Sequence, residues 1–224
     1  MVLVSFDKQF IYTKTVKTAG TSVEYFFQRY CVPPEFGDRL RMPAEMVTDH
    51  GIVGLRGNAR SPETRWYHHL PAAAVRRYLG EDIWRAYFKF CVVRNPFDKV
   101  VSKYFFSLSD EERDNLRTQD FAEVRRGFLA SVGRRRLGID RNAYVIDGEI
   151  CMDYFIRYER LSEGVAEVCQ RLGIARDVGE LKRLKAHARF TDVHFSEFYD
   201  REAAEIVRRA YAFELAHFGY SLRE

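Results

Sequence analysis

The sequence has few cysteines and no long apolar run. Its four cysteines are scattered along the chain without CxxC or CxxH spacing, which argues against a zinc site and against a compact disulfide framework. No stretch of about 18 apolar residues is present to span a membrane. The N-terminal segment becomes charged within its first eight residues, too early for a signal peptide. We therefore expect a cytoplasmic protein that uses no metal and has no membrane partner.

The sequence also lacks a linker rich in Ser, Gly or Pro, a low-complexity tract and an internal repeat. Its 224 residues are 46% hydrophobic and 15% aromatic, which is enough apolar material to build one large core. We therefore expect a single domain over residues 1–224. Nothing in the pattern predicts an oligomeric state.

The formal net charge of +4 is modest, and no basic stripe predicts a nucleic-acid partner. Most basic residues are arginines, whose planar guanidinium group binds phosphate and sulfate oxygens in pairs. The densest basic run is 134–136, with Arg125, Arg126 and Arg141 nearby. We interpret it as a solvated face, with a patch that binds an acceptor as the alternative.

Apolar strand patterns alternate with helical patterns along the chain. β-branched and aromatic runs predict buried strands, and helical spacing with capping residues predicts helices. The strands are expected at 10–13, 87–93 and 150–158, and the helices at 21–30, 71–79, 95–106, 110–136, 162–172 and 200–217. This alternation is typical of an α/β fold with a central parallel sheet flanked by helices, which binds ligands at the carboxyl ends of its strands.

A turn suited to phosphate follows the first strand, in the segment Lys17-Thr18-Ala19-Gly20-Thr21-Ser22. Backbone N–H groups and the helix dipole bind anions at such a place. Gly20 permits close approach of the backbone, while Thr21 and Ser22 add hydroxyl donors. Lys17 adds positive charge, but it precedes the glycine, whereas a Walker A lysine follows it, which disfavours a P-loop nucleotide kinase or NTPase. An ordinary strand-to-helix turn is the alternative.

A second turn of this kind follows the strand that ends at Val93. Asn95 and Pro96 supply an N-cap and a first helical residue. Arg94 at the strand end and Ser102 two turns into the helix would together clamp a phosphate. The alternative is that Arg94 serves a structural salt bridge.

The two segments together resemble the two signatures with which the sulfotransferase family binds 3′-phosphoadenosine-5′-phosphosulfate (PAPS). Further similarity is found at 67–71, 153–161 and 217–220, so the resemblance covers nearly the whole chain and is closest to bacterial and Golgi carbohydrate sulfotransferases. It implies a P-loop-kinase-like sulfotransferase fold, with PAPS as co-substrate and 3′,5′-adenosine bisphosphate (PAP) as product. Residues 17–22 would hold the 5′-phosphosulfate, and Arg94 with Ser102 the 3′-phosphate. Val16, Phe97 and Lys99 depart mildly from the family pattern, where Pro, Trp and Arg are common.

The resemblance also implies the chemistry. Lys17 would stabilise charge on the leaving phosphate, and His69 would be the base that takes the acceptor's proton, with its neighbour His68 as the alternative. The acceptor would be a small molecule or carbohydrate that offers a hydroxyl or, less favoured, an amine.

Lys185 and Arg189 are interpreted as part of a charged loop, with closure over the nucleotide as the alternative. A catalytically silent nucleotide-binding module is the remaining alternative function.

Overall fold

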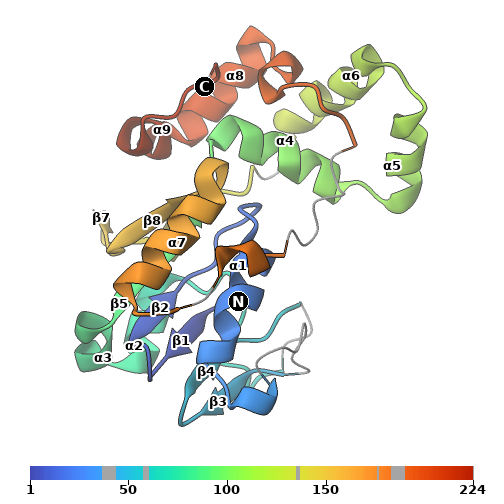
Figure 1. Ribbon diagram of the computed structural model, residues 1–224. Helices are drawn as coiled ribbons and strands as arrows, with labels where there is room; N and C mark the ends of the chain where they lie inside the picture. The colour runs from blue at the N-terminus through green and yellow to red at the C-terminus, as the bar shows by residue number, and fades with distance from the viewer. Residues whose placement is uncertain (37–43, 58–60, 135–136, 176, 183–189, 224) are drawn as a thin grey trace. The chain divides into compact units, whose positions relative to one another are not determined.

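The computed structural model describes residues 1–36, 44–57, 61–134, 137–175, 177–182 and 190–223. The chain folds into two compact units, residues 1–93 with 140–184 and residues 94–139 with 185–224 (Figure 1). Each unit is built from two separate segments, so the chain passes between them three times. A single functional domain over residues 1–224 stays a prediction.

The first unit contains a six-stranded sheet of order β3-β4-β1-β2-β5-β8. The strands are β1 (Leu3–Ser5), β2 (Phe10–Tyr12), β3 (Met46–Thr48), β4 (Gly51–Val53), β5 (Phe88–Val93) and β8 (Tyr154–Arg157). Strands β2, β5 and β8 run parallel, whereas β1, β3 and β4 pair antiparallel with their neighbours. The α/β class with a central sheet and flanking helices is confirmed, and the sheet is mixed because its first four strands in spatial order form an antiparallel half.

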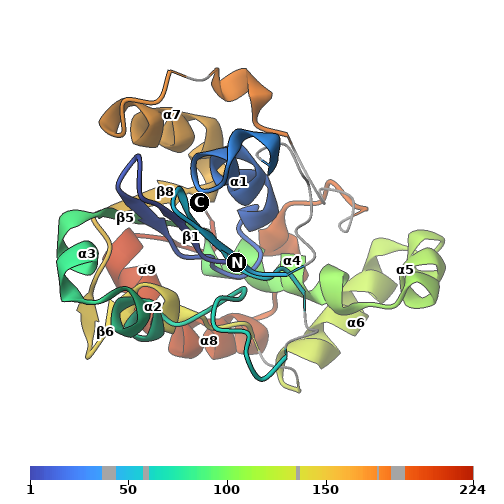
Figure 2. The ribbon, with the colours of Figure 1, turned by 90° about the horizontal axis from the view of Figure 1, so that it is seen from below.

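Helices cover both faces of this sheet. The helices of the first unit are α1 (Gly20–Phe27), α2 (Ala72–Leu79), α3 (Glu81–Ala86) and α7 (Leu161–Arg171), and a two-stranded ribbon is formed by β6 (Val145–Ile146) and β7 (Glu149–Ile150). Helices α1 and α7 lie on one face and α2 on the other (Figure 2). On the first face, Phe27 and Val168 pack against Phe10 and Phe90, all of them fully buried. Each such side chain contributes about 1.5–3 kcal/mol by leaving water, so this cluster holds α1 and α7 against β2 and β5.

The described part of the second unit is helical. Its helices are α4 (Pro96–Ser107), α5 (Asp110–Arg117), α6 (Phe121–Val132), α8 (Arg201–Ala210) and α9 (Ala212–Phe218). Asn95 accepts a hydrogen bond from Phe97 N at 3.0 Å, which confirms the predicted N-cap of α4. The predicted helices 110–136 and 200–217 are each divided: Asp120 caps a new helix, and Tyr211 leaves helical geometry at ψ 24°.

Gly51, at the start of β4, is a position where only glycine fits. Its φ is +150°, and a Cβ there would lie 2.0 Å from the carbonyl oxygen of Val4 in the adjacent strand. We expect Gly51→Ala to lower the free energy of unfolding by about 3–5 kcal/mol, because neither backbone can move without breaking the sheet. Urea unfolding measures the change. The control is Gly133→Ala, where a Cβ meets no atom within 4 Å and the cost should stay within about 0.5 kcal/mol; equal costs for the two variants would contradict the explanation.

Candidate active site

The six residues predicted to hold the donor lie where the loop after β2 runs into α1: residues 17–19 are in the loop and residues 20–22 form the first turn of the helix. Lys17 and Ala19 both adopt left-handed backbone geometry, with φ of 58° and 56°, which costs a non-glycine residue about 1–2 kcal/mol. Such strain gathers at ligand sites. Helix α1 begins at Gly20, and no side chain caps its first turn; Thr21 and Ser22, whose hydroxyls are of the kind that cap helices, lie inside the helix. The loop thus ends in a helix N-terminus of the kind that binds anions.

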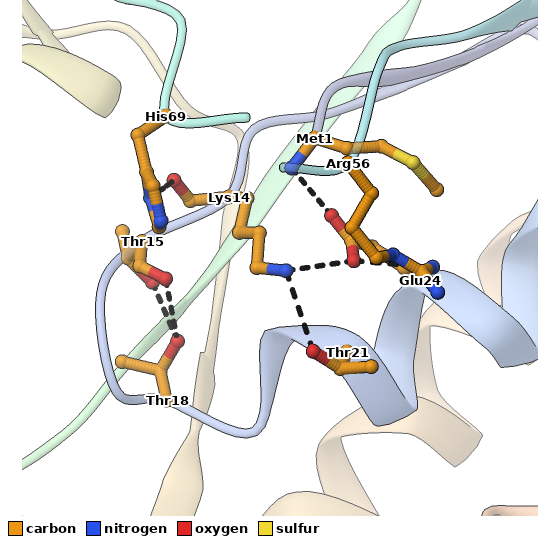
Figure 3. Close-up of polar contacts among 8 residues, drawn as sticks. All are labelled: Met1, Lys14, Thr15, Thr18, Thr21, Glu24, Arg56 and His69. Atoms are coloured by element: carbon orange, nitrogen blue, oxygen red, sulfur yellow. Dashed lines mark hydrogen bonds and ion pairs between the residues drawn. The ribbon is translucent and has the colours of Figure 1, made fainter. Parts of the chain in front are cut away.

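Buried hydrogen bonds hold the loop in this shape. The Thr15 hydroxyl donates to the Val92 carbonyl oxygen at the end of β5. Since that uses its one hydrogen, Thr18 must be the donor in the 2.7 Å contact between the Thr15 and Thr18 hydroxyls (Figure 3). The Asp140 carboxylate accepts from Val16 N on the other side of the loop. The Thr18 side chain, 1% exposed, therefore belongs to the loop's own framework, and a ligand would meet this residue through its backbone.

A buried carboxylate lies beneath the loop. Glu24 of α1 is fully buried and contacts Lys14 Nζ at 2.7 Å, Arg56 Nη2 at 3.4 Å and the Met1 α-amino nitrogen at 2.5 Å (Figure 3). Burial alone would raise the pKa of Glu24, but these positive groups outweigh it and lower the pKa to about 2. Glu24 is thus ionised at neutral pH and anchors the cations around it.

Gly20 makes room for one of these cations. Its missing side chain leaves space for Lys14, since a Cβ would lie 2.8 Å from Lys14 Cε and 2.9 Å from Cγ. The Lys14 ammonium lies 3.5 Å from the Thr21 hydroxyl oxygen (Figure 3). A second lysine therefore reaches the first turn of α1, and the glycine has a packing role that the sequence alone did not indicate.

His69 is tied to the same loop. Its Nδ1 lies 3.0 Å from the Lys14 carbonyl oxygen (Figure 3); since a carbonyl only accepts, Nδ1 carries the hydrogen and Nε2 keeps its lone pair. Burial, followed by the nearby positive charges of the Met1 amino group and Lys14, lowers the pKa of His69 to about 3. The ring of His68 packs edge-on against it, with centroids 5.0 Å apart. His69 is therefore neutral at pH 7, in a fixed tautomer.

The second predicted clamp lies in the second unit. Arg94 precedes α4 and pairs with Asp98 through Nη2 at 2.7 Å and Nε at 2.8 Å, so the structural salt bridge considered for it is present. Ser102 is half-buried on α4, and its spacing of four residues from Asp98 puts both on one helix face. The ion pair holds the guanidinium at the start of α4.

The basic residues considered for an acceptor patch have mixed roles. Arg125 donates to the carbonyl oxygens of Glu197 and Tyr199, a structural role, and Arg126 pairs with Glu123 on the surface. Residues 135–136, together with Lys185 and Arg189, lie outside the described residues. Arg125 and Arg126 are thus engaged in contacts within the chain.

Sequence reasoning missed the residues that support the loop, namely Lys14, Thr15, Glu24 and Asp140. Only Glu24 carries a usable signal: it is an acid next to Val23 in an otherwise apolar, aromatic helix, and such a position indicates a buried charge that needs partners. The contact of Thr15 with Val92 in β5 spans 77 residues of sequence, and that of Asp140 with Val16 in the loop spans 124, separations that no local pattern encodes.

Comparison with known proteins identifies the family. Residues 1–221 match the sulfotransferase family, and the chain belongs to it. An uncharacterized protein of Archaeoglobus fulgidus is 28% identical over 109 residues, which make up 49% of this chain and 87% of that protein. No solved structure matches the chain. Within the described ranges, no helix has the length and apolar character needed to cross a bilayer, and no three His, Cys, Asp or Glu residues gather as metal ligands.

Proposed function

We propose that this protein transfers a sulfuryl group from PAPS to a hydroxyl, or less favourably an amine, of a small-molecule or carbohydrate acceptor. The observation that carries the proposal is the loop 13–22, where two strained non-glycine residues lead into a helix N-terminus without a side-chain cap. Family membership over residues 1–221 supports the reaction class.

In the proposed reaction, residues 17–22 hold the 5′-phosphosulfate, while Arg94 and Ser102 hold the 3′-phosphate. The acceptor oxygen attacks sulfur as the bond from sulfur to the bridging oxygen breaks, and PAP leaves. Such transfer requires alignment of the two oxygens and stabilisation of charge on the leaving phosphate. Lys17 supplies that stabilisation.

His69 is the proposed base. Its fixed tautomer supports this role, because the ring nitrogen that does not bind Lys14 is the one that keeps a lone pair. The proton passes from the acceptor hydroxyl to Nε2 as the new oxygen–sulfur bond forms. We favour His69 as the base because its Nδ1 contacts Lys14 in the loop of the proposed donor site.

Two other functions remain as alternatives, a P-loop-type nucleotide kinase or NTPase and a catalytically silent nucleotide-binding module. A kinase would need a lysine after Gly20 and a carboxylate for Mg²⁺, and the residue at that place is Thr21. A silent module would bind PAP but would never turn over PAPS. We also propose a cytoplasmic location, because the scattered cysteines suit a reducing compartment.

Calorimetric titration of PAP, without added Mg²⁺, tests the donor site. We expect binding in the micromolar range to wild type and a loss of about 10- to 100-fold in Arg94→Ala, since a charge-assisted contact to phosphate is removed. The matched control is Arg126→Ala, an exposed arginine that is also paired with an acid, which should bind PAP as wild type does. If ATP with Mg²⁺ binds and PAP does not, the kinase-like alternative replaces the proposal.

A further inference from the structure

Lys14 connects the proposed base with the proposed donor loop. Its carbonyl oxygen accepts the hydrogen of His69 Nδ1 at 3.0 Å. At the other end of the residue, Nζ donates to Glu24 Oε2 at 2.7 Å and lies 3.5 Å from Thr21 Oγ1 (Figure 3). The side chain thus crosses Gly20 and places its ammonium against the first turn of α1.

We propose that Lys14 is a positioning residue for sulfuryl transfer: its ammonium, anchored by Glu24, orients the Thr21 hydroxyl so that this hydroxyl donates to the 5′-phosphosulfate. The inference rests on the proposed function. An ammonium offers only hydrogens, so the Thr21 oxygen faces it and the single hydroxyl hydrogen points away. Among the described residues, Lys14 is the one hydrogen-bond partner of that hydroxyl. The orientation leaves the hydrogen available to an anion at the helix N-terminus.

Three features keep the ammonium in this place. Glu24 is fully buried and ionised, so it binds its cations strongly in a medium of low dielectric constant. Arg56 shares the carboxylate from the other side at 3.4 Å. The methylene groups of Lys14 fill the space above Gly20. Together the three charged side chains carry one net positive charge beside the turn that would receive the sulfuryl donor.

Two nucleotides and one conservative variant test the proposal. Lys14→Met keeps an unbranched chain over Gly20 but removes the ammonium. PAP carries the 5′-phosphate that the turn would bind, whereas adenosine 3′-monophosphate lacks it. We expect Lys14→Met to weaken PAP binding about tenfold in calorimetry and to leave the affinity for adenosine 3′-monophosphate unchanged. Arg94→Ala should weaken both ligands, because it acts on the 3′-phosphate.

A double-mutant cycle tests whether Lys14 acts through Thr21. Thr21→Val removes the hydroxyl at nearly constant shape, and alone it should also weaken PAP about tenfold. If the two residues act as one unit, the double variant Lys14→Met/Thr21→Val should lose about tenfold rather than a hundredfold. Losses that multiply would overturn the proposed link between Lys14 and the hydroxyl.

The removal of Lys14 leaves the buried Glu24 with one cation fewer, which tends to destabilise the fold. A second variant, Lys14→Met/Glu24→Gln, therefore removes both charges, and the same selective loss of PAP affinity is expected. Equal weakening of both nucleotides would overturn the inference in favour of a purely structural role, as would unchanged PAP binding. If wild type binds neither nucleotide, the proposed function fails and this inference fails with it.

Discussion

Lys17→Ala is expected to lower kcat for sulfuryl transfer about 10²- to 10³-fold, the usual cost of removing one group that stabilises transition-state charge. PAP affinity should fall much less, because the charge that Lys17 meets on the leaving phosphate develops fully only during the reaction. Alanine keeps a Cβ, so the strained left-handed backbone at this position, φ 58°, changes little. Single-turnover rates with PAPS and an accepted substrate measure the effect.

Two further variants sharpen this result. Lys17→Arg retains the charge but spreads it over a planar guanidinium, so it should recover only part of the rate. Lys8→Ala is the matched control, because Lys8 is a lysine of the same unit whose ammonium contacts the Gly173 carbonyl oxygen at 3.4 Å, away from the loop. If Lys17→Ala turns over as fast as Lys8→Ala, then Lys17 has no role in the chemical step.

His69→Asn is expected to lower kcat about 10²- to 10⁴-fold by removing the base. Asparagine is the sharpest replacement, since it tolerates the positive φ of 56° found here and its amide can still donate to the Lys14 carbonyl oxygen. The substitution therefore removes only the Nε2 atom, which is the proposed proton acceptor. His68→Asn is the control, and it should keep kcat within a few fold of wild type. A large loss in His68→Asn with none in His69→Asn would assign the base to His68.

The lowered pKa of His69 has consequences with a definite sign. A base works only when deprotonated, so with a pKa of about 3 the acid limb of kcat/KM due to His69 lies well below the ordinary histidine value of 6.5. The unfolded chain binds a proton at 6.5 that the folded protein does not, so the unfolding free energy falls as pH drops from about 6.5 toward 3. His69→Asn should flatten that slope in urea unfolding measured across this interval. An unchanged slope would show that His69 is not held neutral by the fold.

The parts of the fold that the sequence predicts are those with long or chemically marked patterns. The strands 88–93 and 10–12, the loop after each and the Asn95 cap lie where the apolar runs and capping residues put them. By contrast, β1, β3 and β4 were not predicted: they have three residues each, as β2 does, which is too few to display a period, and they lack the aromatic residues that mark β2. These strands pair antiparallel with their neighbours. The predicted parallel sheet is therefore only one half of the sheet that forms.

The sequence likewise predicts some residues of the candidate site and not others. The residues that would touch the donor were predicted because they form local signatures, and their roles stay predictions. The residues that shape the loop were not predicted, because Thr15 bonds to Val92 and Asp140 bonds to Val16 across long separations in sequence. The role of Gly20 illustrates the difference: the sequence suggests a ligand as the reason for the glycine, and the structure adds the Lys14 side chain as a second one.

The buried Glu24 carboxylate also restricts which substitutions the surrounding positions can accept. Glu24 would lose two of the three positive groups that contact it in the interior if Lys14 and Arg56 were replaced, and either of these cations would lose its anchor without the acid. Substitutions at positions 14, 24 and 56 therefore belong to one correlated set, in which a neutral residue at 24 is accompanied by loss of positive charge at 14 or 56. Where a short residue replaces Lys14, the steric demand for glycine at position 20 disappears as well, so that the four positions should co-vary among relatives.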